Sequence, residues 1–314
     1  MTSSGKIDEY LGELRDFKGS PFYPRNVLGK IPISADISVI IFLWFIGNTE
    51  PLRTFSERFD VSISSVFRII RRVADFLLYK SPDIIKWPQN GQIPNITNKF
   101  QLIAGMPNVI GAIDCTHVKI VTPKVNSRDF YNRKKYHSIN LQGVVDPEMR
   151  FINVYCGEPG SLHDARVLRR SPLYHAANNN QNLLFPMNTH IIGDSVYPIF
   201  PWLVKPYKDN GLLIPNERHF NRLISTTRVV VERAFGCLKG RFRRIKFFTE
   251  YTDLPFVVKV VMSACVLHNY CINENDTPVD TDEDDDSDFE DPLDENIDGI
   301  DHRERLLKLL LNET

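Results

Sequence analysis

The sequence predicts an α/β domain that is preceded by an all-helical region. Between residues 106 and 272, short apolar segments of strand length alternate with longer segments of helical periodicity, an order that is typical of α/β folds. Residues 35–80 show helical periodicity throughout. Residues 81–105 contain three prolines and two glycines, which favours a connector between the two regions. The 314 residues are enough for one large domain or two ordinary ones.

Three helices are expected over residues 35–80, after an N-terminal segment formed by residues 1–34. The first, ADISVIIFLWFIG, is apolar enough to be buried, but its longest apolar run of ten residues is too short to cross a bilayer. LRTFSERF and SISSVFRIIRRVADFLLY follow it. Between them, Asp60 suits the left-handed conformation of a tight turn, and Ser62 can cap the third helix. We expect no contact with a membrane.

Two short helices, a tight turn and a basic second helix are typical of a helix-turn-helix. The side chains of Arg68, Arg71 and Arg72 fall largely off the apolar stripe of the third helix. We therefore predict that these three arginines contact DNA, chiefly at its phosphates. The alternative is a helical hairpin that serves only for packing, with its arginines facing solvent.

Acidic residues stand at three marked places in the α/β region. Asp114 ends the strand-like segment VIGAID, and Asp194 ends the segment THIIGD. Strand ends lie at the sheet edge, where α/β folds bind ligands. Glu232 belongs to the helical segment TTRVVVERAFGCLKGRF and lies one step round from its apolar stripe. It could therefore lean over the edge of the core toward the two aspartates.

Three carboxylates in one place repel each other unless a cation lies between them. Oxygen ligands favour Mg²⁺ or Mn²⁺, and two such ions support phosphodiester chemistry. We predict that Asp114, Asp194 and Glu232 are catalytic metal ligands. Each acid also has a structural alternative, because an aspartate at a strand end often forms a turn. Arg228, four residues before Glu232, could pair with that glutamate.

Charge is distributed unevenly along the chain. Residues 276–301 contain 14 acidic residues and no Lys or Arg, whereas residues 1–275 contain 35 basic and 23 acidic residues, a net charge of +12. We expect the acidic segment to be disordered and to compete with nucleic acid for the basic body. Residues 302–314 are expected to form a short closing helix.

Further candidates carry weaker signals. The basic segment KGRFRRIK and residues 133–135 could bind phosphates, and either could equally be solvated surface or a nuclear import signal. We expect the protein in the nucleus, and the cytoplasm stays open as a further location. The former segment contributes four DNA-binding candidates: Lys239, Arg241, Arg243 and Arg244. His163 and Asp164 could form a catalytic pair or bind a metal ion, but a helix-capping role is favoured because adjacent strand residues point to opposite sides. Five cysteines without C-x-x-C spacing indicate reduced thiols.

Several ordered motifs resemble a known family. GAIDCTHVKI, PGSLHDARVL, IIGDSVYP, RVVVERAFGCLKGRFR and CVLHNYCI, together with an earlier Trp-Pro pair, resemble the PIF/Harbinger DDE transposases, and above all the Harbinger transposase-derived nucleases. The resemblance runs from about residue 20 to 275. It implies an RNase H-like nuclease domain over residues 106–275, with the metal-ligand role on the three acids. Cys115 departs from the family, which usually has glycine there.

The resemblance leaves two classes of function open. One is a metal-dependent endonuclease or transposase. The other is a domesticated transposase that acts as a DNA- or chromatin-binding adaptor without using catalysis. The resemblance also implies a Myb/SANT-like protein partner that helps DNA binding and nuclear entry. Self-association into a homo-oligomer stays open as well.

Overall fold

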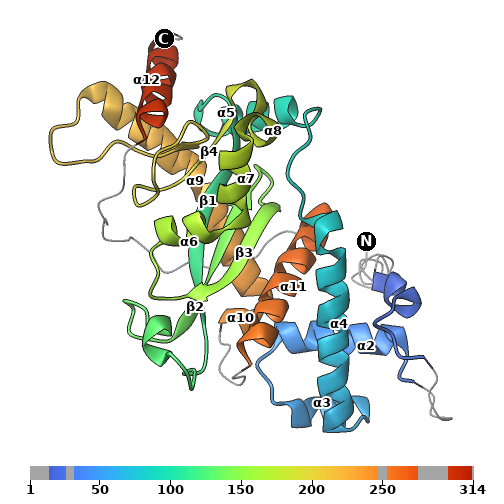
Figure 1. Ribbon diagram of the computed structural model, residues 1–314. Coiled ribbons are helices and arrows are strands. Elements are labelled where there is room, and N and C mark those ends of the chain that lie inside the picture. The colour runs from blue at the N-terminus through green and yellow to red at the C-terminus, as the bar shows by residue number, and fades with distance from the viewer. Residues whose placement is uncertain (1–13, 26–31, 247–252, 275–295, 313–314) are drawn as a thin grey trace. The chain divides into compact units, whose positions relative to one another are not determined.

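The computed structural model describes residues 14–25, 32–246, 253–274 and 296–312, which divide into two compact units (Figure 1). We call them the helical unit and the sheet unit. The helical unit consists of the described residues of the ranges 1–85, 118–124 and 237–281. The sheet unit consists of the described residues of 86–117, 125–236 and 282–314.

The N-terminal helices of the helical unit form as predicted, except that the third continues past residue 80 into the expected connector, with Pro82 inside the helix. They are α2 (Ala35–Gly47), α3 (Leu52–Phe59) and α4 (Ile63–Ile84), after the 3-10 helix η1 (Arg15–Gly19). Asp60 has φ 50° and ψ 48°, the left-handed conformation that turns the chain between α3 and α4. The Ser62 hydroxyl accepts a hydrogen bond from the Ser65 N–H at 3.2 Å. The three helices, the turn and the cap are thus confirmed, while DNA binding by this region stays a prediction.

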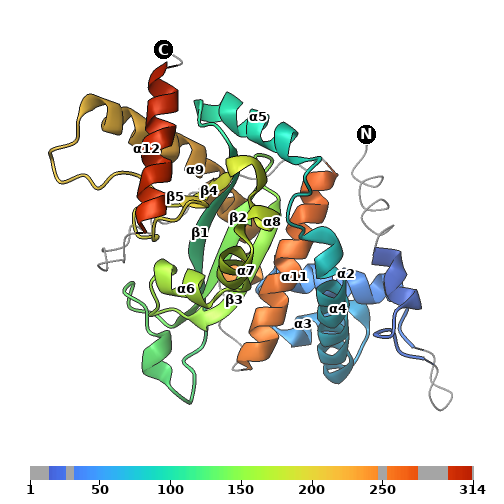
Figure 2. The same cartoon turned by 45° about the horizontal axis from the view of Figure 1, so that its top comes forward.

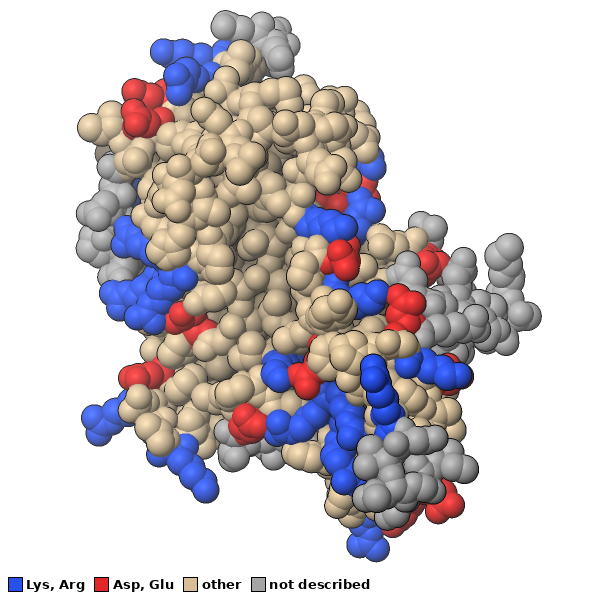
Figure 3. Space-filling model, turned by 45° about the vertical axis from the view of Figure 1, so that its right-hand side comes forward, with Lys and Arg blue, Asp and Glu red and all other residues tan. Residues whose placement is uncertain are grey.

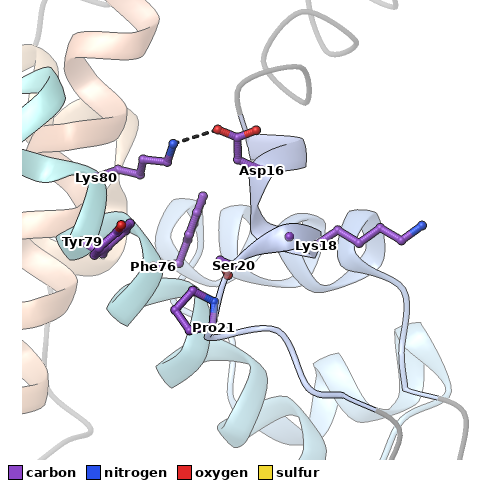
Figure 4. A pocket seen from close by; sticks show the side chains of 8 residues that line it. Asp16, Lys18, Ser20, Pro21, Phe76, Tyr79 and Lys80 are labelled. Carbon is purple, nitrogen blue, oxygen red and sulfur yellow. Dashed lines mark hydrogen bonds and ion pairs between the residues drawn. The ribbon is translucent and has the colours of Figure 1, made fainter.

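The 3-10 helix η1 and α4 together line the pocket drawn in Figure 4. Phe17 is 1% exposed, and its ring centroid lies 5.4 Å from that of Phe76. Lys80 donates to Asp16 at 2.7 Å beside a pocket of about 640 Å³. Because Asp16 is largely exposed, this ion pair adds little to stability. The buried side chain of Phe17 therefore contributes more to holding η1 in place.

The long helix α11 (Leu254–Asn273) packs against α4 in the helical unit, together with the short α10 (Arg243–Lys246). Lys259 donates to Asp75 at 2.5 Å across this contact. Among the described residues, α11 alone is long and apolar enough to span a membrane. Most of it is buried inside the helical unit, however, as a core helix would be. The structure thus places α11 with the N-terminal helices, although the sequence placed it in the nuclease domain.

The sheet unit contains a five-stranded mixed sheet, which confirms the predicted α/β class. The order is β3-β2-β1-β4-β5, with β2 and β3 antiparallel and β1, β4 and β5 mutually parallel. The strands are β1 (Val109–Lys119), β2 (Ser138–Val145), β3 (Phe151–Pro159), β4 (His190–Ile192) and β5 (Leu203–Val204). The predicted segment VIGAID lies in β1, which continues beyond it to Lys119.

Helices cover both faces of this sheet (Figures 1 and 2). The short helices α6, α7 and α8 lie on one face, and α9 crosses the other, where Phe235 contacts Phe151 of β3 at a ring distance of 5.7 Å. The expected connector contains a helix, α5. Pro94 does not prevent this helix, because it stands in the first turn, where proline is tolerated. The helical elements of this unit are α5 (Ile93–Ala104), η2 (Ser127–Phe130), α6 (Asp164–Arg170), α7 (Pro172–Asn179), α8 (Gln181–Leu184), η3 (Pro186–Asn188), α9 (Pro215–Arg241) and α12 (Ile297–Asn312).

The closing helix α12 begins earlier than predicted and packs beside β5. It starts at Ile297, so Asp298 and Asp301 of the acidic segment are helical rather than disordered. The remainder of that segment, residues 276–295, lies outside the described residues. His302 of α12 meets the fully buried His190 of β4, with 3.3 Å between Nε2 and Nδ1. Burial, and secondarily His302, lowers the pKa of His190 to about 3.

This histidine pair predicts a loss of stability at acidic pH. The folded pKa of His190 lies below its ordinary value, so the unfolded chain binds the extra proton, and stability is lost as pH falls below about 6.5. The loss is about 1.4 kcal/mol per pH unit, or roughly 2 kcal/mol at pH 5. Urea unfolding at pH 7.5 and pH 5.0 should show this decline in wild type and a smaller one in His190→Gln. His175→Gln, at an exposed position, should behave as wild type. An equal decline in His190→Gln would contradict the assignment.

Candidate active site

Two of the predicted acids lie at the same level of neighbouring parallel strands. Ala112 of β1 is the register partner of Ile192 of β4, and Asp114 and Asp194 each follow two residues later. Parallel strands with a common rise per residue therefore bring the two aspartates to the same edge. Asp114 does not end its strand, as the sequence suggested, because β1 continues to Lys119. It lies just beyond the point where the pairing of β1 with β4 stops.

Backbone contacts fix both aspartates. The Oδ1 atom of Asp114 accepts a hydrogen bond from the Cys115 N–H at 2.8 Å. The Oδ1 atom of Asp194 accepts from the Val196 N–H at 3.0 Å. Glycine is needed at position 193, because a Cβ there would lie 2.8 Å from a ring carbon of Tyr197. The small residue thus lets the chain turn closely after β4 and present Asp194.

Glu232 reaches the site from α9. As predicted, Val231, Ala234 and Phe235 are buried on the stripe beside it, whereas the Glu232 side chain is 47% exposed. Arg228, one helical turn earlier, links this glutamate to the sheet. Its Nη2 atom donates to Asp114 Oδ2 at 3.0 Å and lies 3.5 Å from Glu232 Oε1. The Arg228–Glu232 pair considered from the sequence is therefore present, and the same guanidinium also binds Asp114.

The three acids and Arg228 influence one another electrostatically. The pKa of Asp114 is raised to about 7, chiefly by burial; the charge of Arg228 opposes this shift, and the charges of Asp194 and Glu232 add to it. Burial lowers the pKa of Arg228, but the charges of Asp114, Asp194 and Glu232 outweigh it and raise that pKa overall. The predicted acids therefore surround one buried positive charge.

The arrangement differs from a preformed metal cluster. Within the described ranges, no three His, Cys, Asp or Glu side chains group closely enough to hold a metal ion. The donor chemistry nevertheless fits a hard cation, since all three side chains offer carboxylate oxygens. A cation, the Arg228 guanidinium, already bridges Asp114 and Glu232. The residues therefore suit a divalent metal ion, although Arg228 stands among them in this structure.

A further acid near the site is buried, and the sequence analysis did not place it there. Asp164, expected to cap a helix, is 8% exposed at the first residue of α6. Burial of the Cys115 thiol raises its pKa well above the ordinary value, and the negative charge of Asp164 adds to this shift. That thiol lies 3.5 Å from the Tyr197 hydroxyl. His163 is the N-cap residue, but its side chain makes no capping hydrogen bond. The sequence analysis favoured capping because adjacent strand residues point to opposite sides, and the sequence could not show that Asp164 lies close to Cys115 of β1.

The arginines predicted on α4 differ in their surroundings. Arg71 donates to Asp253 at 2.6 Å, and its guanidinium lies 4.6 Å from the ring centroids of both Phe67 and Phe256. Arg68 is exposed and contacts the Ser65 hydroxyl at 3.4 Å. Arg68 and Arg72 line a pocket of about 360 Å³ with Arg25, Pro24 and Pro32 among the other lining residues. Figure 3 shows basic side chains gathered around the lower part of α4.

The second group of DNA-binding candidates is corrected at one position. Arg244 is 2% exposed, donates to the carbonyls of Phe45 and Glu50 at 2.9 and 2.6 Å, and stacks over the Phe45 ring. It is a structural residue, because a guanidinium enclosed in this way cannot reach a phosphate. Arg243 is exposed, whereas Lys239 and Arg241 are partly buried and have other interactions.

Comparisons with known proteins agree with the resemblance in the motifs. Residues 113–269 match the family described as DDE superfamily endonuclease. The ALP1-like protein of Arabidopsis thaliana is 31% identical over 290 residues, 88% of this chain and 70% of that protein. Antagonist of Like Heterochromatin Protein 1, also from Arabidopsis thaliana, is 29% identical over 80% of this chain and 65% of its own length. The candidate nuclease HARBI1 of Rattus norvegicus is 28% identical over 83% of this chain and 77% of its own length. No solved structure matches the chain.

Proposed function

Because the chain belongs to the DDE superfamily endonucleases of the PIF/Harbinger type, we propose that it cleaves DNA phosphodiester bonds with Asp114, Asp194 and Glu232. The observation that carries this proposal is the register of β1 and β4, which brings two aspartates level beside a helix that supplies the glutamate. The mixed sheet, with an antiparallel pair followed by parallel strands, supports an RNase H-like core.

Endonucleases of this superfamily generally depend on divalent metal ions, and we propose Mg²⁺ or Mn²⁺ for this chain. Such ions activate the attacking oxygen and stabilise the leaving oxygen of a phosphodiester. The three carboxylates would hold them, since each is fixed on a rigid strand edge or helix. The half-buried position of Asp114 keeps bulk water from screening its charge, and Glu232 remains accessible to a large substrate.

The proposal requires metal-dependent DNA cleavage by the protein, either alone or with a partner. Purified protein should nick or linearise supercoiled plasmid with Mg²⁺ or Mn²⁺, and EDTA should stop the reaction. The plasmid assay must also include conditions with a Myb/SANT-like partner, because we propose that such a protein assists DNA binding and nuclear entry. Absence of cleavage with every divalent ion, with and without that partner, would contradict the endonuclease proposal.

We propose that DNA contacts the helical unit through Arg68 and Arg72. In the described part of the chain, neither is paired with a carboxylate, whereas Arg71 is paired with Asp253. Each phosphate contact contributes about one unit to the slope of log affinity against log salt. Arg68→Ala and Arg72→Ala should each weaken DNA binding and flatten this slope by about one unit.

Arg71→Ala is the matched control, because it removes the same charge from the same helix. We expect a smaller change in slope, measured by fluorescence anisotropy from about 50 to 200 mM salt. An unchanged slope in both Arg68→Ala and Arg72→Ala would show that α4 does not bind DNA through these arginines. An equal effect of Arg71→Ala would show that the ion pair with Asp253 does not keep Arg71 from DNA.

The second candidate is a chromatin- or DNA-binding adaptor that does not use its acids. It is favoured by the similarity to Antagonist of Like Heterochromatin Protein 1, whose name refers to heterochromatin. Both candidates place the protein in the nucleus. They differ in one cellular result: an adaptor keeps its function when Asp114 or Asp194 is changed to Asn, and an endonuclease does not.

A further inference from the structure

Arg228 occupies the position among the acids that a metal ion would need. Its Nη2 atom donates to Asp114 Oδ2 at 3.0 Å, and the same nitrogen lies 3.5 Å from Glu232 Oε1. The other oxygen of Asp114 already accepts the Cys115 N–H. The Asp114 oxygen left to face a ligand is therefore the one that holds the guanidinium. The Arg228 side chain is 16% exposed, so the charge lies inside the site rather than over its surface.

The guanidinium is not fully satisfied in this position. Its Nε atom is buried and has no hydrogen-bond partner among the described residues. A guanidinium that serves only to brace a fold usually has its donors paired, because each buried unpaired donor is costly. The contact with Glu232 is long, and that glutamate is 47% exposed. Arg228 is thus held by charge more than by complete hydrogen bonding, and another cation could replace it.

We propose that Arg228 is a built-in counter-ion that holds the acids in the metal-free protein and competes with divalent metal for them. This inference depends on the proposed metal role of Asp114, Asp194 and Glu232. A small hard cation needs carboxylate oxygens at roughly 2.0–2.1 Å. The guanidinium cannot remain bonded to the same oxygen, because like charges at that separation repel strongly. Metal binding therefore requires Arg228 to leave Asp114, and Arg228 is a positioning residue for the site.

Competition predicts the direction in which a substitution of Arg228 changes metal affinity. If Arg228 holds the place of the metal, then Arg228→Gln removes the competitor and tightens metal binding. If Arg228 instead stays and orients Asp114 for the metal, the same variant weakens binding. Arg222→Gln is the matched control, because Arg222 is an exposed residue of the same helix and its charge is screened by solvent at physiological salt.

The experiment is a Mn²⁺ titration at pH 8.5, followed by electron paramagnetic resonance of the free ion. Arg228→Gln should bind Mn²⁺ at least about fivefold tighter than wild type, whereas Arg222→Gln should bind within about twofold. Equal or weaker binding by Arg228→Gln, with saturable binding by wild type, would overturn the counter-ion role alone. Absence of saturable binding in all three proteins would overturn the metal role of the acids and the counter-ion role with it.

A second measurement decides the question if Arg228→Gln does not fold. Wild-type crystals soaked with Mn²⁺ should show the ion by anomalous scattering, with Arg228 beyond hydrogen-bond distance of Asp114 Oδ2. An ion bound to the acids with the Arg228 contact intact would overturn the proposal.

Discussion

Asp114→Asn, Asp194→Asn and Glu232→Gln should each fold and each lose metal-dependent DNA cleavage by about three orders of magnitude or more. The substitutions keep the size of the side chain but remove the negative charge that a hard cation needs. Folding should survive at position 114, because the amide oxygen can still accept from the Cys115 N–H, although the amide nitrogen cannot accept from Arg228. Asp114→Asn also removes the cost of burying a negative charge, and that burial is the main cause of the raised pKa of Asp114.

The measurement is the initial rate of plasmid nicking with Mg²⁺ and with Mn²⁺, alongside the thermal midpoint of each variant. Asp209→Asn is the control, since this exposed aspartate accepts the Gly211 N–H, as asparagine also can. It should cleave as wild type does. DNA affinity should change little in all four variants, because basic residues elsewhere carry it. Near-normal cleavage by any triad variant would remove that residue from the catalytic set.

Arg244→Ala should have the largest effect on stability, lowering the free energy of unfolding by about 2–4 kcal/mol. The variant leaves the carbonyls of Phe45 and Glu50 without their donor and empties the space beside the Phe45 ring. Both losses occur inside the helical unit, where water can replace the guanidinium only poorly.

Arg243→Ala provides a matched comparison, because the neighbouring residue carries the same charge and is exposed. Its unfolding free energy should stay within about 0.5 kcal/mol of wild type. Urea unfolding of both variants at pH 7.5 tests the assignment. If Arg244→Ala were as stable as Arg243→Ala, the buried guanidinium would not support the helical unit.

The sequence predicted the N-terminal helices well because their signals are local. Asp60 and Ser62 determine a turn and a cap within a few residues, and the helical period is independent of distant contacts. The boundary of α12 was less accurate, because Asp298 and Asp301 belong to an acidic run whose composition resembles that of a disordered segment. Packing beside β5 and the contact between His302 and His190 outweigh that local preference.

The candidate site was predictable in its residues but less so in its geometry. Short apolar segments of strand length predicted that Asp114 and Asp194 follow buried strands, and the apolar stripe of the helix predicted that Glu232 lies beside the core. The register of β1 and β4, however, depends on pairing between segments about 80 residues apart. The sequence therefore could not show that the two aspartates lie at the same level of the sheet. For the same reason, the sequence could pair Arg228 with Glu232 but could not show that its guanidinium also binds Asp114.

The most direct test of the account is whether one of the acids touches the metal ion that supports cleavage. Asp194→Cys replaces a hard oxygen ligand by a softer sulfur, which Mn²⁺ accepts more readily than Mg²⁺. If Asp194 holds the ion, the variant should cleave plasmid DNA poorly with Mg²⁺ and regain activity with Mn²⁺, while wild type works with both. Cleavage by Asp194→Cys at the wild-type rate with Mg²⁺, or an equal loss with both ions, would contradict a metal-ligand role for Asp194.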